Sequence, residues 1–169
     1  MKKFVLGLLA MGLTSPAFSQ IVKTEQLSEV TVYATNYKYL NDVNTLEVAS
    51  VPVELLERKV SAYDVKDSDF YQDDYDFYSI NFYIPQGKIL AAYDKDGNLL
   101  STAEKFKDIN LPQAVKQAVW DKYPKWTITK DVYLVNYKDG RGAKKTYKLK
   151  LENEDQTIRV KLNEKGEFL

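Results

Sequence analysis

The 169-residue chain contains no cysteine and no histidine. Without cysteine it has no disulfide framework, no thiol nucleophile, no thiolate metal ligand and no N-terminal cysteine for lipidation. Without histidine it has no Ser-His-Asp triad, no imidazole base near neutral pH and no imidazole-ligated zinc. Catalysis would have to depend on carboxylates, lysine, tyrosine or serine alone. The composition therefore favours a binding protein over an enzyme, and we expect no catalytic residues, no metal and no cofactor.

Two further absences narrow the function classes. The sequence contains neither a GxxxxGK[ST] nor a GxGxxG phosphate-binding motif. Its 24 basic residues are balanced by 24 acidic residues, which is not typical of nucleic-acid-binding proteins. Paired carboxylates can hydrolyse glycosides, but no two carboxylates in the sequence are marked out for that role. We therefore expect neither a nucleic-acid partner nor a recognisable enzyme.

The N-terminal segment 1–19 has the form of a secretory signal peptide. Lys2 and Lys3 precede the apolar run Phe4–Leu13, and the small residues Ala17 and Ser19 follow it. A membrane anchor is the alternative, but ten residues of helix rise only about 15 Å, half the thickness of the hydrocarbon core. We therefore expect cleavage before residue 20 and a periplasmic or secreted protein. The mature chain is expected to have no membrane span and not to be a lipoprotein.

The N-terminal part of the mature chain predicts a strand, a loop and a helix. Residues 29–40 alternate between apolar and polar positions, which predicts a strand, and residues 41–44 interrupt it as a loop. Pro52 suits the first turn of a helix over residues 52–62. We expect this helix to bury Val53, Leu56 and Val60 and to expose Glu54, Glu57, Arg58 and Lys59.

A hairpin follows this helix. Residues 75–84 alternate and predict a strand with one apolar and one mixed face. Residues 94–98 (DKDGN) have the composition of a hairpin turn, which predicts that residues 88–93 pair with residues 99–102.

The same pattern then restarts. Pro112 opens a second predicted helix, which extends to Tyr123 and buries Val115, Ala118 and Val119. Strands are predicted over residues 126–137, 144–151 and 156–162. The start of the helix at Pro52 thus recurs at Pro112, and the turn that ends in Gly97 recurs at a similar interval in the turn that ends in Gly166. We expect an α+β fold of tandem helix-plus-antiparallel-meander repeats, although helices followed by strands can also recur by chance.

These motifs resemble the PepSY-like, or β-lactamase-inhibitor-like, family of small exported bacterial proteins. The resemblance rests on residues 87–100 (GKILAAYDKDGNLL), then 111–115 (LPQAV), then Tyr123-Pro124, in that order. It implies helices on one face of an antiparallel sheet whose other face is open, and proteins that bind or inhibit other proteins. It implies no catalytic residues. The expected organisation is a signal peptide (1–19), an N-terminal strand and linker (20–47), a first repeat (48–110) and a second repeat (111–169).

The open sheet face is the candidate partner-binding surface. Tyrosine and arginine are favoured at protein interfaces because they bury much area and keep a polar group. The alternative is an ordinary solvated sheet face that carries lysines for solubility. The residues expected on this face are Ser79, Asn81, Tyr83, Tyr133, Tyr137, Lys148, Lys150, Arg159 and Lys161.

Charge is unevenly distributed along the chain. Residues 20–110 have a net charge of −7 and residues 111–169 a net charge of +5, which can steer a charged partner or hold the two halves together. Six aspartates lie in residues 64–76, which we call the Asp-rich loop, and carboxylates are ligands for Ca²⁺. The spacing matches no EF-hand. The sequence therefore favours a non-catalytic protein-binding module, with a small-ligand or Ca²⁺-binding protein that uses the Asp-rich loop as the alternative.

Overall fold

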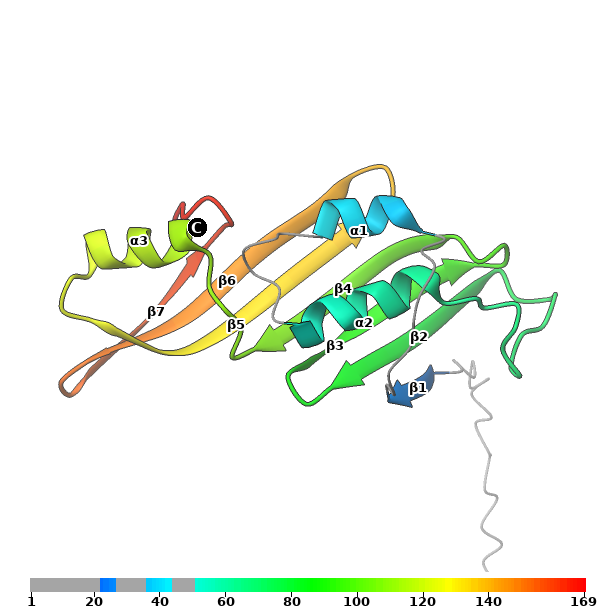
Figure 1. Cartoon of the computed structure of the whole chain (residues 1–169), viewed down its shortest axis with the longest axis horizontal. Helices are drawn as coiled ribbons and strands as arrows, with labels where there is room; N and C mark the ends of the chain where they lie inside the picture. Colours follow the sequence, from blue (N-terminus) through cyan, green and yellow to red (C-terminus); the bar gives the residue numbers. More distant parts are fainter. Residues whose placement is uncertain (1–21, 27–35, 44–50) are drawn as a thin grey trace, which may run out of the picture.

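The computed structural model describes residues 22–26, 36–43 and 51–169 of the chain (Figure 1). The expected signal peptide lies outside these residues. The described helices are α1 (Tyr37–Val43), α2 (Val51–Ala62) and α3 (Gln113–Lys122). The described strands are β1 (Val22–Gln26), β2 (Phe77–Ile84), β3 (Gly87–Asp94), β4 (Leu99–Lys107), β5 (Thr127–Lys138), β6 (Gly142–Asn153) and β7 (Gln156–Leu162). The fold class is therefore α+β.

All seven strands belong to one sheet, in the order β1 to β7. β1 pairs with β2 in parallel, and each later pair of neighbours is antiparallel. The β3–β4 turn falls at Gly97, whose φ of 85° is a conformation that glycine adopts without strain. The predicted hairpin at residues 94–98 is therefore confirmed. The two long strands β5 and β6 connect the two halves of the sheet: β5 runs past β4 at one end, and β6 runs past β7 at the other (Figure 1).

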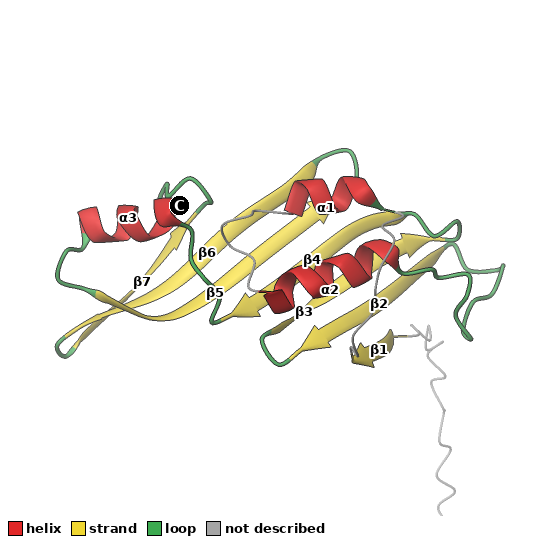
Figure 2. Ribbon diagram, in the orientation of Figure 1, coloured by secondary structure: helices red, strands yellow, loops and turns green. Residues whose placement is uncertain are grey.

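The three helices pack on one side of this sheet. α1 contacts β5 and β6, α2 contacts β2 and β3, and both lie in front of the strands in Figure 2. Alternate strand residues are buried beneath them, among them Ile80 and Phe82 of β2 and Ile89 and Ala91 of β3. The side chains between these positions point to the other face. We call the helix-covered side the inner face and the other side the outer face.

α3 covers the inner face at the β7 end of the sheet. Its Val115 and Val119 are buried in the same hydrophobic core as Leu149 and Leu151 of β6. The C-terminal turn packs against α3 so closely that a Cβ on Gly166 would lie 2.6 Å from a backbone oxygen of the helix. The predicted second helix and its buried stripe are confirmed, with Ala118 partly buried.

Three predictions about local structure are wrong. The C-terminal end of the strand expected over residues 29–40 is helical, because Tyr37–Val43 forms α1 and buries Tyr39 and Val43. Residues 29–35 and 44 lie outside the described residues, and residues 41–43 of the expected loop also belong to α1. β4 extends five residues beyond the predicted 99–102, since it continues through the charged residues Glu104, Lys105 and Lys107.

In the described part of the chain, no helix is both long enough and apolar enough to span a bilayer.

Candidate functional site: the outer face of the sheet

The outer face is formed by every second residue of β2 to β7. β2 contributes Ser79, Asn81 and Tyr83, all of which are half-buried. Next to them, Leu90 of β3 is 44% exposed although it is a large apolar side chain. Leu90 stands opposite Asn81 on one side and Ala103 of β4 on the other. This part of the outer face therefore presents apolar and amide groups in one continuous patch, which we call the β2–β3 patch.

Two residues expected on the outer face lie on the inner face instead. Tyr133 is 2% exposed and stacks on Tyr147, with 4.9 Å between ring centroids. Tyr137 is 4% exposed and packs edge-on against Tyr39 of α1. The cause is a bulge in β5 between Ile128 and Lys130, after which the odd-numbered positions of β5 point inward. The assignment of Tyr133 and Tyr137 to a partner-binding surface is therefore wrong.

The other predicted residues do lie on the outer face. Lys148, Arg159 and Lys161 are exposed and Lys150 is half-buried. Their cross-strand register brings them together, because Lys148 stands opposite Lys161 and Lys150 opposite Arg159. The same bulge in β5 places Lys130, which the sequence did not single out, opposite Lys150.

These cations surround an open groove of about 380 Å³ across β5, β6 and β7, which we call the basic groove. Lys130 and Lys150 lie at one level of the three strands, and Lys148 and Lys161 lie at the next. Val132 belongs to this second level, where it stands opposite Lys148. The lining residues are Lys130, Asp131, Val132, Lys148, Leu149, Lys150, Arg159, Val160 and Lys161.

Little negative charge offsets these cations. Lys150 pairs with Glu152 on its own strand, and the hydrogen bond from Lys150 is the main cause that lowers the pKa of Glu152. The carboxylate of Asp131 accepts a hydrogen bond of 3.2 Å from the backbone N–H of Ile109. Within the described chain, Lys148, Arg159 and Lys161 have no ion pair. Among the described residues, the groove therefore carries a net positive charge.

A second set of charged residues, which sequence patterns did not reveal, lies in the core beneath α1 and α2. Glu57, Glu104 and Lys145 are between 3% and 7% exposed. The expectation that Glu57 belongs to the solvated side of its helix is wrong. Glu104 Oε1 accepts hydrogen bonds from Tyr39 Oη at 2.8 Å and from Thr102 Oγ1 at 2.6 Å. These three charged residues and the two hydroxyl donors together form what we call the polar core cluster: Tyr39, Glu57, Thr102, Glu104 and Lys145.

Burial perturbs every charge in the polar core cluster. Burial raises the pKa of Glu57, the negative charge of Glu104 raises it further, and Lys145 lowers it. Burial also raises the pKa of Glu104, while hydrogen bonds from Thr102 and Tyr39 act in the opposite direction. Burial lowers the pKa of Lys145. Acids with raised pKa values are common in catalytic sites. In this conformation, however, the carboxyl groups of Glu57 and Glu104 are buried, so a substrate in solvent does not reach them.

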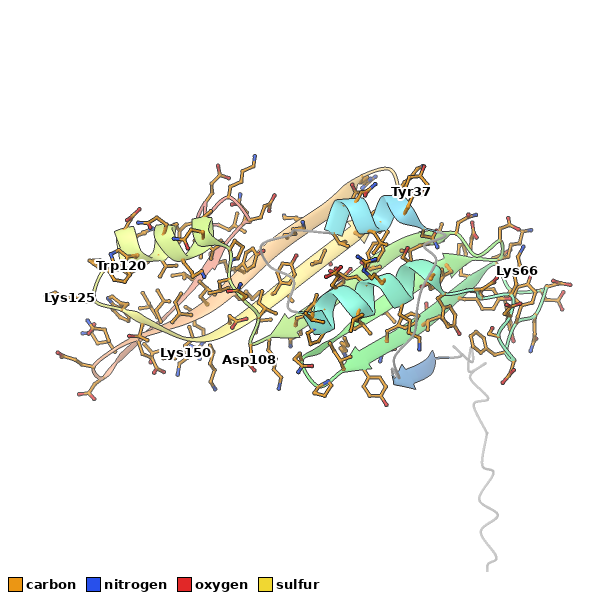
Figure 3. The ribbon with its side chains drawn as sticks, viewed as in Figure 1. Tyr37, Lys66, Asp108, Trp120, Lys125 and Lys150 are labelled. Carbon is orange, nitrogen blue, oxygen red and sulfur yellow. The ribbon has the colours of Figure 1, made fainter. Side chains whose placement is uncertain are left out.

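The Asp-rich loop does not gather its carboxylates. In the described ranges, which include the whole loop, no three acidic residues come close enough to one another to hold a metal ion. The loop and the basic groove also lie apart along the long axis of the molecule, as the labels of Lys66 and Lys150 in Figure 3 indicate. The opposite charges of the two halves therefore do not pair at these two places.

The function has to be inferred from this geometry. Comparisons with protein-family models, with curated proteins and with solved structures give no match.

Proposed function

We propose that the chain is an exported, non-catalytic protein-binding module that docks its partner on the outer face of the sheet. The observation that carries the proposal is the contrast between the two faces. All three described helices pack on the inner face, whereas the outer face leaves Leu90 44% exposed and presents the basic groove, three of whose cations have no ion pair among the described residues. Contiguous apolar patches that polar residues surround are typical of protein interaction sites.

Export is part of this proposal and follows from the sequence of the N-terminal segment 1–19. A mature chain that starts at residue 20 has no cysteine and is stabilised by packing alone. The aromatic core supplies that packing, with Tyr39, Tyr93, Tyr133 and Tyr147 among the largest fully buried side chains. N-terminal sequencing of the protein purified from the cell envelope or the medium should begin at Gln20.

The order of elements supports a duplicated architecture of the PepSY-like type. α2 precedes the antiparallel strands β2, β3 and β4, and α3 precedes the antiparallel strands β5, β6 and β7. Both helices pack on the same side of the sheet. The resemblance to the PepSY-like family adds that binding can inhibit the partner, and we include inhibition in the proposal for that reason.

A capture experiment tests the docking surface. The mature protein is immobilised and exposed to the envelope fraction of its own cells, and each captured protein is identified, purified and bound again in isolation. Tyr83→Ala with Leu90→Ala should abolish that binding, since both side chains belong to the outer face. Val51→Ala with Leu55→Ala is the matched control, because these apolar residues are exposed on α2 instead. Equal binding by the outer-face variant would refute the site.

A further inference from the structure

The basic groove has features that solubility alone does not explain. Lysines at the surface of a sheet usually keep it soluble, and they serve this purpose best when acidic residues alternate with them. In the basic groove, by contrast, like charges stand directly opposite each other in two adjacent pairs, Lys148 with Lys161 and Lys150 with Arg159. Like charges in direct cross-strand positions destabilise a sheet. The groove therefore retains an electrostatic cost that an added anion would relieve.

We propose that the basic groove binds an extended, carboxylate-rich segment of a protein partner. This inference rests on the proposed function and names the chemistry of the partner at one part of the docking surface. The cations form two rows across the strands, one of Lys130, Lys150 and Arg159 and the other of Lys148 and Lys161.

The spacing of the rows suits a polypeptide. Residues i and i+2 of one strand lie about 6.6 to 6.8 Å apart, and this is the distance between the two rows. An extended peptide has the same repeat, so acidic side chains at alternate positions would reach both rows at once. The positive field continues along the outer face, because Lys107 of β4 stands opposite Val132 on the side away from Lys148.

The side chains of the groove favour carboxylates over nucleic acid. Among the described residues that line it, none has an aromatic ring on which a base could stack. The chain as a whole is neutral, so it does not carry the excess positive charge typical of proteins that bind polyanionic backbones.

A peptide-binding assay on the purified mature protein tests this inference without the natural partner. The probe is a fluorescein-labelled peptide of four Glu-Thr repeats, and four Gln-Thr repeats form the uncharged control. Fluorescence anisotropy should show binding of the Glu-Thr peptide only, and the affinity should fall at least tenfold between 50 mM and 300 mM NaCl because the contacts are ionic.

Two variants with the same change in net charge locate the site. Lys148→Gln with Lys161→Gln should weaken Glu-Thr binding at least tenfold and raise the urea midpoint of unfolding at low salt, since it removes a like-charge pair. Lys116→Gln with Lys125→Gln, which removes two exposed cations near α3, should change binding less than twofold. Equal losses in both variants would overturn the inference in favour of non-specific attraction. So would competition by 10 mM inorganic phosphate, which would indicate a simple anion site.

The results of the peptide-binding assay distinguish a failure of this inference from a failure of the proposed protein-binding function. If Lys148→Gln with Lys161→Gln abolishes binding of the Glu-Thr peptide and also weakens binding of the purified natural partner, both proposals are supported. If the Glu-Thr peptide does not bind while Tyr83→Ala with Leu90→Ala still abolishes partner binding, the protein-binding function stands and the inference about the basic groove is wrong.

Discussion

Replacement of Glu104 by glutamine should change how the stability of the protein depends on pH. Glu104 is 3% exposed, and its Oε1 accepts hydrogen bonds from Tyr39 and Thr102. Its Oε2 is buried and has no partner among the described residues. A glutamine can keep the first two hydrogen bonds through its own oxygen, and it carries no charge at any pH. The substitution therefore removes one titrating group from the core while preserving its shape.

The sign of the effect follows from the raised pKa of Glu104. The folded protein raises this pKa from 4.5 to about 7, so the native state holds a proton that the unfolded chain releases. The resulting stability is fully present below pH 4.5 and is lost as the pH rises to about 7. At about 1.4 kcal/mol for each tenfold change in proton affinity, the loss is on the order of 3 kcal/mol. The raised pKa of Glu57 adds a loss of the same sign.

Urea unfolding of the two proteins between pH 4 and pH 8, at constant ionic strength, measures this loss. The free energy of unfolding of the parent should fall across the range, and that of Glu104→Gln should fall by about 3 kcal/mol less. Glu154→Gln, which changes an exposed carboxylate in the β6–β7 turn, should follow the parent at every pH. A constant difference between Glu104→Gln and the parent over the whole range would refute the linkage to Glu104.

Three further substitutions test the packing. Gly166→Ala should destabilise the protein more than Gly140→Ala in urea unfolding: both glycines have positive φ, for which an L-residue costs about 1–2 kcal/mol, but only Gly166 also lies against the backbone of α3. Tyr133→Ala should cost about 3–5 kcal/mol because the side chain is fully buried, whereas Tyr83→Ala should cost less than about 1 kcal/mol; equal losses would contradict the assignment of these residues to opposite faces. Tyr39→Phe should lower the free energy of unfolding by about 1–3 kcal/mol. The loss should be larger at pH 8 than at pH 5, because the hydrogen bond that is removed favours ionised Glu104. A loss that does not vary with pH would indicate lost packing alone.

Periodicity predicted the regular elements where one face of an element is clearly apolar. The helix over residues 52–62 and the strand around Ile80 and Phe82 have such a pattern, and both are confirmed. β5 does not, because Val132 and Leu134 on one face are as apolar as Tyr133 and Val135 on the other. A bulge then shifts the alternation, and sequence alone cannot place a bulge. The sequence pattern therefore exchanges the two faces of β5 and predicts Tyr133 and Tyr137 on the outer face, whereas they lie on the inner face.

The polar core cluster was missed for a different physical reason. Charged residues are rarely buried, so Glu57 was expected on the solvated side of its helix and Glu104 was not expected in a strand at all. Their burial becomes favourable only when hydrogen-bond donors from distant segments meet them, as Tyr39 meets Glu104 across 65 positions of sequence. Such long-range pairing leaves no local pattern. The cations of the basic groove were found more easily, since Lys148, Lys150, Arg159 and Lys161 alternate with apolar residues along their own strands.

The separation of the two faces of each strand affects how this protein can change over evolutionary time. Residues such as Leu149 and Leu151 determine whether the chain folds, while their immediate neighbours Lys148 and Lys150 contribute little to the core. Substitutions at the second kind of position can accumulate without loss of the native state. A lineage could therefore acquire a new recognition specificity in small steps on an unchanged scaffold, and the same independence would allow the sheet to be redesigned in the laboratory.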